Sequence, residues 1–330
     1  MSTKHSATAI AHPNIALAKY WGKRAPREAN GGNVPATPSV SLTLAGLQTR
    51  TTVTFDESLI EDQLELDGAL VVGKPRQRVQ ALLDELRALA HTKHHAYVVS
   101  DNDFPTASGL ASSASGFAAL VRASSAALHL DLENDALSRI ARRASASAAR
   151  SVFGGFVALG TEDDAPAIPV ARASHWTLSV VVAAVTTGAK PIGSTDGMER
   201  TRLTSPYYAA WLDDAPKVAT EVRAAILARD LEKLGTAAEA SAMRMHACAH
   251  AANPAIVYWT SATLELLAAV RALRAEGISA WATIDAGPHV KILCATDDAP
   301  KVVGRVAPLC VRTIVASPGE GARVVTGPVR

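Results

Sequence analysis

The segment 104–120 constrains the fold of this chain more than any other, because it joins a loop of small residues to an apolar helix. Pro105 and Gly109 interrupt regular structure, and serine, alanine and glycine predominate up to Gly116. Helix N-termini leave backbone N–H groups unpaired and carry partial positive charge, and small residues let a phosphate approach them closely. The segment therefore predicts a phosphate-binding loop; the alternative is a tightly packed helix start that binds no ligand.

The composition is typical of a soluble protein of enzyme size. The 330 residues can form one large or two ordinary domains, with 48% hydrophobic and 19% charged residues. The net charge of +2 provides no basic excess for nucleic acid or an anionic membrane. Residues 1–12 lack the apolar core of a secretory signal, and no apolar run approaches the ~18 residues of a transmembrane helix. Cys248, Cys294 and Cys310 are far apart and odd in number, which predicts no disulfide framework and a cytoplasmic location.

Two groups of histidines are candidates for a metal site. His91, His94 and His95 lie in a short polar stretch, which is more typical of a solvated turn. His246 and His250 are four residues apart on an expected helix, a spacing that suits a metal. The glutamate of a His-Glu-x-x-His motif is missing, so we expect histidines on a helix face instead.

The hydrophobic pattern predicts an α+β protein. Before residue 130 it indicates strands over 39–44, 50–55 and 97–100 and helices over 76–91 and 110–128. Between residues 130 and 200 we expect a helix over 134–150, strands over 153–159 and 176–185, and a loop over 186–198. After residue 200 we expect helices near 204–228, 230–248 and 256–275, and then strands over 278–284 and 289–294. The last expected elements are a helix near 298–309 and strands near 311–316 and 322–326. This mixed order is not that of a doubly wound fold, and the small-residue loop lacks the Walker and Gly-x-Gly-x-x-Gly patterns.

Residues 14–24 gather cations around two aromatic rings. Lys19, Lys23 and Arg24 surround Tyr20 and Trp21. Cations and a phenol suit a ligand that carries phosphate and carboxylate groups. The alternative is an amphipathic strand whose lysines extend toward solvent.

Two further segments carry groups suited to anions or to proton transfer. On the expected helix over 134–150, Ser147 and Arg150 share one face near Ser145, and together they can bind phosphate or carboxylate oxygens. The alternative is a solvated basic face. Asp285 lies between an apolar strand and a Gly-Pro turn, where a carboxylate can contact a ligand or simply stabilise the turn.

Taken together, these segments resemble the mevalonate diphosphate decarboxylases, a family within the kinase superfamily named for galactose, homoserine, mevalonate and phosphomevalonate kinases. The resemblance covers roughly residues 9–295. The shared motifs, in the family's order, are Asn-Ile-Ala-x-x-Lys-Tyr-Trp-Gly-Lys-Arg, Phe-Pro-Thr-Ala-x-Gly-Leu-Ala-Ser-Ser-Ala, Ser-x-Ser-Ala-x-Arg-Ser-x-Phe-Gly-Gly and Asp-Ala-Gly-Pro. The segments Ser194-Thr-Asp-Gly-Met and Met245-His-Ala also look like family features.

The resemblance implies a two-domain superfamily fold and an activity. It places a ribosomal-S5-domain-2-like domain with the phosphate loop over 1–186 and a ferredoxin-like domain with the catalytic aspartate over 187–330. The implied reaction is ATP-dependent decarboxylation of (R)-5-diphosphomevalonate to isopentenyl diphosphate, with release of ADP, phosphate and CO2, in the mevalonate route to isoprenoids. Mg²⁺ accompanies ATP, and family members are commonly homodimers.

The resemblance also implies roles for particular residues. The catalytic residues would be Asp285, Lys19, Asn14 and Arg150. The substrate would contact Tyr20, Lys23, Ser145, Ser147, Arg150 and Ser194. ATP would contact Pro105, Ser108, Gly109, Leu110, Ala111, Ser112 and Ser113, and the last two would also help to place Mg²⁺.

Some positions depart from the family pattern. Ala144 and Ala146 stand where the family often has glycine, Pro38 lies in a stretch that is often Thr-Asn-Ser-Ser, and His289 replaces a common asparagine. These changes leave two other activities open, decarboxylation of 5-phosphomevalonate and 3-phosphorylation of mevalonate. A third alternative is a ligand-binding relative without activity, against which the intact Asp285 argues.

Overall fold

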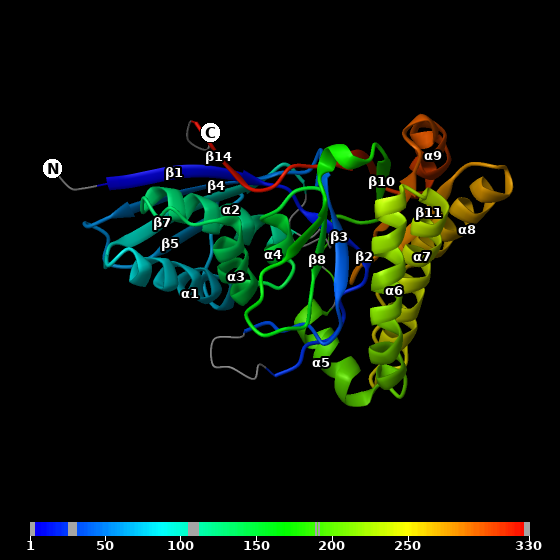
Figure 1. The fold of residues 1–330 in the computed structure, drawn as a ribbon, viewed down its shortest axis with the longest axis horizontal. Coiled ribbons are helices and arrows are strands. Elements are labelled where there is room, and N and C mark those ends of the chain that lie inside the picture. Colours follow the sequence, from blue (N-terminus) through cyan, green and yellow to red (C-terminus); the bar gives the residue numbers. More distant parts are fainter. Residues whose placement is uncertain (1–3, 26–31, 105–111, 189, 191, 327–330) are drawn as a thin grey trace.

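The computed structural model describes residues 4–25, 32–104, 112–188, 190 and 192–326. Within them the strands form two sheets that lie along the long axis of the molecule, each with helices packed on it (Figure 1). Helices and antiparallel sheets alternate irregularly along the chain, which confirms the expected α+β fold. No helix in these ranges is both long and apolar enough to cross a membrane.

The N-terminal sheet has six strands in the described part of the chain, in the order β14-β1-β4-β7-β5-β6. Its strands are β1 (Lys4–Ala11), β4 (Thr49–Asp56), β5 (Gln63–Leu66), β6 (Ala69–Leu70), β7 (His95–Asn102) and β14 (Arg323–Val325). The helices α1 (Lys74–Leu89), α2 (Ser112–Ala127), α3 (Asn134–Ala144) and α4 (Ala148–Ser151) accompany it. Val53, Leu83, Ala118 and Leu137 are fully buried in the core between this sheet and its helices. The neighbouring strands β5 and β7 run parallel, and the other pairs are antiparallel.

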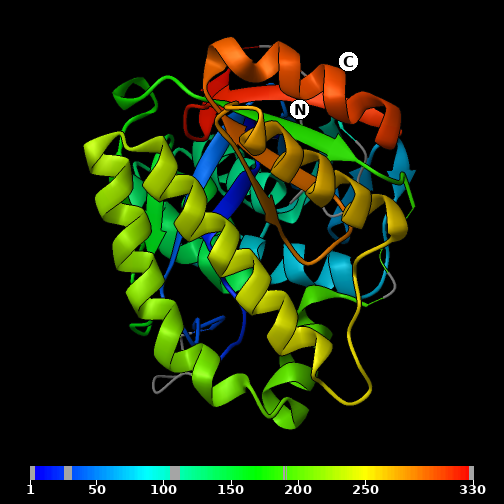
Figure 2. The same ribbon diagram turned by 90° about the vertical axis from the view of Figure 1, so that its right-hand side faces the viewer.

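The second sheet has eight strands among the described residues and is covered on both faces. It contains β2 (Asn14–Ala18), β3 (Ser39–Ala45), β8 (Phe156–Leu159), β9 (Ile168–Ala171), β10 (Ser179–Ala184), β11 (Ala280–Ile284), β12 (Val290–Cys294) and β13 (Arg312–Pro318). Alternate residues of a strand point to opposite faces. Val180 and Val182 therefore pack with α6 (Tyr208–Ala228) and α7 (Leu231–His250), whereas Val181 packs with α8 (Ser261–Ala275) and α9 (Ala299–Val306). Figure 2 shows α6 and α7 side by side as a long antiparallel pair.

Strand β10 lies inside this second sheet although it precedes residue 186. It pairs with β12 on one side and with β13 on the other, and β13 continues to β3. Hydrogen bonds of one sheet therefore join strands from both parts of the chain. The domain boundary after residue 186 stays a prediction.

The prediction of a single helix over 134–150 is wrong for the second half of that range. Helix α3 ends at Ala144, Ser145 is extended with φ −156° and ψ 120°, and a separate short helix, α4, begins at Ala148. Serine side chains compete with the backbone for hydrogen bonds, which weakens a helix there. Ser147 and Arg150 therefore do not share the face of one continuous helix.

The loop predicted over 186–198 is also partly wrong, because helix α5 (Ser194–Thr204) begins inside it. Glycine lowers helix propensity, so Gly197 favoured a loop. Tertiary packing decides otherwise: a Cβ at Gly197 would lie 2.7 Å from Tyr258 Oη and 3.0 Å from Trp21 Cη2. The strands β1, β5, β6 and β9 were not predicted as strands, β2 was expected only in the alternative interpretation of residues 14–24, and α5 and α6 are separate helices.

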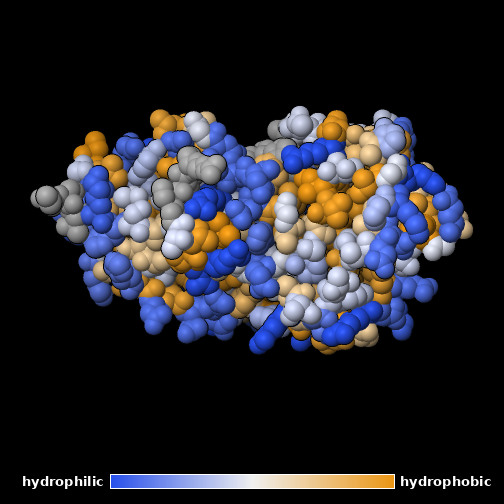
Figure 3. Space-filling view, turned by 90° about the horizontal axis from the view of Figure 1, so that it is seen from above, coloured by the Kyte–Doolittle hydropathy of each residue, from blue (hydrophilic) through white to orange (hydrophobic). Residues whose placement is uncertain are grey.

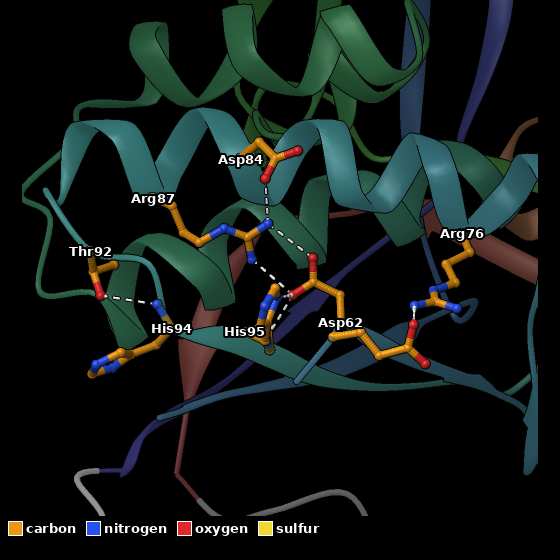
Figure 4. A network of polar contacts seen from close by, with 9 residues as sticks. Asp62, Arg76, Asp84, Arg87, Thr92, His94 and His95 are labelled. Atoms are coloured by element: carbon orange, nitrogen blue, oxygen red, sulfur yellow. Dashed lines mark hydrogen bonds and ion pairs between the residues drawn. The ribbon is translucent and has the colours of Figure 1, made fainter. Parts of the chain in front are cut away.

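The histidines near residue 95 lie beside a buried ion pair. Arg87 donates two hydrogen bonds to the carboxylate of Asp62, at 2.8 and 2.9 Å, and the backbone N–H of Ala96 donates a third at 2.8 Å. Figure 4 shows His95 next to Asp62, with His94 turned away from it. This network joins α1, the start of β5 and β7. Among the described residues no group of three histidine, cysteine or acidic side chains could hold a metal ion.

Candidate active site

A cavity of about 570 Å³ lies between the N-terminal segment, the start of α2, the α3–α4 turn and the β11–β12 turn. Within the described chain, its charged lining comprises five cationic side chains and one carboxylate. The carboxylate is Asp285, and the cations are Lys19, Lys23, Arg78, Arg150 and Lys190. Such a surplus of positive charge around a single carboxylate suits a ligand with several negative charges.

Asp285 follows β11, and two lysines hold its carboxylate. Lys19 Nζ lies 2.7 Å from Oδ1, and Lys291 Nζ lies 3.1 Å from Oδ2. Burial alone would raise the pKa of Asp285, but the charges and hydrogen bonds of the two lysines outweigh it and hold the pKa below its usual range. Asp285 is therefore an ionised hydrogen-bond acceptor at the cavity wall.

Lys19 stands directly after β2, whose five residues are all buried. Its backbone N–H donates to Ser241 Oγ of α7 at 2.9 Å, and its Nζ donates to the Ala16 carbonyl at 2.8 Å. Burial lowers the pKa of Lys19 to about 8, although the charge of Asp285 opposes the change. Lys19 is thus a rigidly held ammonium with only 2% of its side chain exposed.

Arg150 is a buried guanidinium held by neutral groups. Its Nε donates to Ser41 Oγ at 3.0 Å and Nη1 donates to Ser39 Oγ at 2.8 Å. Asn14 Oδ1 accepts from Nε at 3.3 Å and from Nη2 at 3.2 Å, while its Nδ2 donates to the Ser147 carbonyl and to Ser151 Oγ. No carboxylate in the described ranges lies within 4 Å of Arg150, and burial lowers its pKa to about 10. A buried cation without an anion beside it is well suited to bind one.

Hydroxyl groups line the wall near Arg150. Ser145 Oγ and Ser147 Oγ lie 3.2 Å apart in the turn between α3 and α4, and both residues line the cavity. The Tyr20 hydroxyl is buried without a hydrogen-bond partner in the described part of the protein, and burial raises its pKa. These groups can donate to oxygen atoms of a ligand.

Two more lysines reach the cavity from the side of α5. Lys23 Nζ donates to Asn33 Oδ1 at 2.6 Å and contacts Thr195 Oγ1 at 3.4 Å. Lys190 Nζ donates to Ser194 Oγ at 2.7 Å and to the Ala286 carbonyl at 3.2 Å. Burial lowers the pKa of both lysines. The structure therefore brings Lys23 and Ser194 to the same cavity as Asp285.

Gly22 shapes the turn that delivers Lys23. Its φ of 113° is a conformation that residues with a Cβ rarely adopt, and a Cβ there would lie 2.3 Å from Tyr208 Oη. The preceding Trp21 is fixed by a 3.1 Å hydrogen bond from its Nε1 to Thr201 Oγ1 of α5. The Tyr-Trp-Gly-Lys motif therefore anchors one aromatic ring and turns the chain toward the cavity.

Ser112 and Ser113 begin α2 and line the cavity. They also line a second cavity of about 180 Å³, whose walls come from α1, α2, β4, β5 and β7. Arg78 lines both cavities and packs over the Phe117 ring at 4.7 Å from its centroid. The predicted contacts Pro105, Ser108, Gly109, Leu110 and Ala111 lie outside the described residues.

Several polar residues at the site were not predicted from the sequence. Asn33, Arg78, Lys190 and Thr195 line the cavity, and Lys291 supports Asp285. One signal was available for Lys291, which is a lone charge in the apolar strand Val290–Cys294. Thr195 lies in the Ser194-Thr-Asp-Gly-Met segment, which had already indicated the family, and the other three lie in segments whose pattern is that of an ordinary solvated surface.

Family models match both parts of the chain. The diphosphomevalonate decarboxylase-like N-terminal domain matches residues 11–170, and the mevalonate 5-diphosphate decarboxylase C-terminal domain matches residues 180–318. The diphosphomevalonate decarboxylase of Candida albicans is 36% identical over 308 residues, which is 87% of this chain and 84% of the relative. That of Saccharomyces cerevisiae is 31% identical over 326 residues, 91% of this chain and 80% of the relative.

Solved structures agree with these matches. Mevalonate diphosphate decarboxylase from Staphylococcus aureus superimposes with a TM-score of 0.91 at 34% identity, over 98% of this chain and 99% of the other. The enzyme from Enterococcus faecalis, described with mevalonate diphosphate-mediated ATP binding, gives a TM-score of 0.88 at 38% identity, over 98% and 100%. A further similar structure, described as MDDEF in complex with MVAPP, AMPPCP and magnesium, gives 0.89 at 39% identity, also over 98% and 100%.

Proposed function

Since this chain belongs to the diphosphomevalonate decarboxylase family, we propose that Asp285, Lys19 and Arg150 form its reaction centre. The chain is an ATP-dependent decarboxylase that converts (R)-5-diphosphomevalonate into isopentenyl diphosphate and releases ADP, phosphate and CO2. One observation carries the residue assignment: a single carboxylate, held by lysines, faces a cavity with five cationic side chains in the described chain.

Asp285 orients the tertiary hydroxyl of the substrate. A tertiary alcohol leaves poorly, so it is first phosphorylated at the expense of ATP; loss of that phosphate and of CO2 then forms the double bond. Asp285 accepts the hydrogen bond of the 3-hydroxyl and takes its proton. Because its pKa is held low, the proton moves to Asp285 only as the new O–P bond forms.

Lys19 stabilises the charge that develops on the transferred phosphoryl group. Its ammonium contacts Asp285 and lines the same cavity, so the acceptor of the proton and the stabilising cation lie on one wall. The hydrogen bonds to Ala16 and Ser241 fix this position before any ligand arrives. Such preorganisation avoids reorientation during the reaction.

Arg150 binds the carboxylate that leaves as CO2. Its hydrogen bonds to Asn14, Ser39 and Ser41 occupy three of its five N–H groups among the described residues, and the other two suit a carboxylate. Asn14 acts through Arg150, because its amide oxygen accepts from the guanidinium. The neutral cradle leaves the charge of Arg150 for the substrate.

The diphosphate end of the substrate meets cations and hydroxyls. Lys23 and Lys190 contribute the charges, and the hydroxyl groups come from Tyr20, Ser145, Ser147 and Ser194. Ser145 and Ser147 lie in the α3–α4 turn beside Ala144 and Ala146, and their hydroxyl oxygens are 3.2 Å apart. Each contact between an ammonium and a phosphate oxygen is a charge-assisted hydrogen bond.

The smaller cavity receives the nucleotide, and its phosphates extend toward Ser112 and Ser113. These hydroxyls lie at the start of α2, where a helix N-terminus favours negative charge, and they line both cavities. Arg78 reaches the same junction. The donor set suits Mg²⁺ held chiefly by phosphate oxygens, and the ion, when bound, neutralises phosphate charge.

Release of ADP and CO2 tests this assignment. Both products are measured with mevalonate, its 5-phosphate and its 5-diphosphate, on the unmodified protein. The expected result is equal release of ADP and CO2, and it is fastest with the diphosphate. Faster CO2 release from the monophosphate would overturn the diphosphate assignment, and ADP without CO2 would indicate a kinase.

Two properties of the whole molecule belong to the same proposal, namely that it is cytoplasmic and that it forms a homodimer. The three cysteines in the described chain are free, which suits a reducing compartment. Figure 3 shows hydrophobic residues gathered over the C-terminal half of one face, and Val311 and Val315 are more than half exposed. A second copy would bury apolar surface of this kind. Sedimentation analysis at micromolar concentration tests the dimer, and a monomer would contradict it.

A further inference from the structure

Lys291 is a buried cation that touches Asp285 from behind the cavity. It is the second residue of β12, paired with Thr283 of β11 and Val182 of β10. Its exposure is 1%, and it is not among the residues that line the cavity. Its Nζ lies 3.1 Å from Asp285 Oδ2, whereas Lys19 contacts Oδ1.

We propose that Lys291 is a positioning residue that keeps Asp285 ionised and oriented while the charge of Lys19 stabilises the transferred phosphoryl group. The inference rests on the proposed role of Asp285 as acceptor of the hydroxyl proton. With one lysine alone, the same ammonium would have to neutralise the carboxylate and the phosphoryl oxygens in turn. With two, each carboxylate oxygen has its own partner.

The burial of Lys291 supports this role. A lysine within a sheet is costly unless an anion compensates its charge, and an apolar side chain would pack there more favourably. Its cross-strand neighbours on the same face, Val182 and Thr283, are fully buried. A cation at this place therefore serves Asp285 better than it serves the stability of the sheet.

Other titratable groups also face Lys291 and Asp285. Lys190 approaches from the segment before α5, Arg150 from α4, and His246 from α7. Burial lowers the pKa of His246 to about 3, so it stays neutral at ordinary pH and does not replace either lysine. Arg150 and Lys190 line the cavity, where an anionic ligand meets them. Lys291 alone among these described cations is shielded from the cavity.

The pH profile separates positioning from a merely structural role. Besides burial, the positive charge of Lys291 helps to hold the pKa of Lys19 near 8. Removing that charge raises the pKa of Lys19, so the basic limb of kcat/KM must move to higher pH. A change that only loosened the sheet would not move this limb.

The test compares Lys291→Met with Lys291→Arg, and uses Lys301→Met as a control on an exposed lysine of α9. For Lys291→Met we expect at least a tenfold loss of kcat, KM values for ATP and diphosphomevalonate within threefold, and the upward shift of the basic limb. Lys291→Arg restores the limb and most of kcat, and Lys301→Met behaves like the unmodified protein. If Lys291→Met does not fold, Lys291→Gln keeps a hydrogen bond to Asp285 without the charge and must shift the limb in the same direction.

Two outcomes overturn the proposal. One is a basic limb that stays in place with kcat within twofold. The other is a fall in kcat with a parallel rise in the KM values for ATP and diphosphomevalonate and no movement of the limb. Failure of the underlying function is distinct, because then the unmodified protein itself would not release CO2 from diphosphomevalonate.

Discussion

Replacement of Arg150 by lysine tests the centre of the site most directly. The substitution keeps a positive charge but removes the planar fork that binds a carboxylate with two parallel hydrogen bonds. In the structure this fork is oriented by Asn14, Ser39 and Ser41. A lysine ammonium has three N–H groups and cannot satisfy these acceptors and a substrate carboxylate together.

The expected loss follows from the contacts. A hydrogen bond to a charged group contributes about 1.5–3 kcal/mol, and each ~1.4 kcal/mol corresponds to a factor of ten. Loss of one such contact to the substrate carboxylate lowers kcat/KM by about 10-fold to 100-fold. The buried acceptors left without Arg150 also lower the free energy of unfolding by about 1–3 kcal/mol.

The assay is CO2 release from diphosphomevalonate at saturating ATP, with urea unfolding of the same preparations. Arg305→Lys is the control, because Nη2 of Arg305 donates to both carboxylate oxygens of Glu276 on the surface and Arg305 does not line the cavity. The control should retain activity within twofold. Activity of Arg150→Lys within twofold of the unmodified protein would refute the assignment of Arg150 to the substrate carboxylate.

Three further substitutions and pH measurements follow from the same geometry. Asp285→Asn keeps the shape of the side chain but removes the proton acceptor, so turnover should fall roughly 10²-fold or more with unchanged circular dichroism; near-normal turnover would remove Asp285 from catalysis. Lys23→Met should weaken binding of the diphosphate more than that of unphosphorylated mevalonate, as measured by calorimetry, and an equal penalty for both would contradict its contact with the phosphates. Because the pKa of Lys19 is lowered to about 8, its charge is present below that pH and lost above it, so kcat/KM should decline above about pH 8. Lys19→Met should abolish this decline, and persistence of the decline in that variant would assign it to another group.

Local sequence patterns determined much of the fold. The stripe of apolar residues in α1 and the alternation in β4 follow from side-chain periods of 3.6 and 2, which any stretch of chain expresses by itself. The motifs around Lys19, Arg150 and Asp285 likewise indicated the family before any contact was known. The structure brings all three to one cavity, as the resemblance implied.

Tertiary contacts decided what local patterns could not. The start of α5 at Ser194 depends on the packing of Gly197 against Tyr258 and Trp21, which outweighs helix propensity.

The sequence by itself determined which chemical groups this protein carries and in which family order they occur. The tertiary structure alone decided that Lys291, within an apolar strand, faces the same carboxylate that Lys19 contacts across 266 residues. The physical reason is that a sequence does not show which groups contact a charged residue. In a fold, a buried charge must be compensated by an opposite charge or by hydrogen bonds.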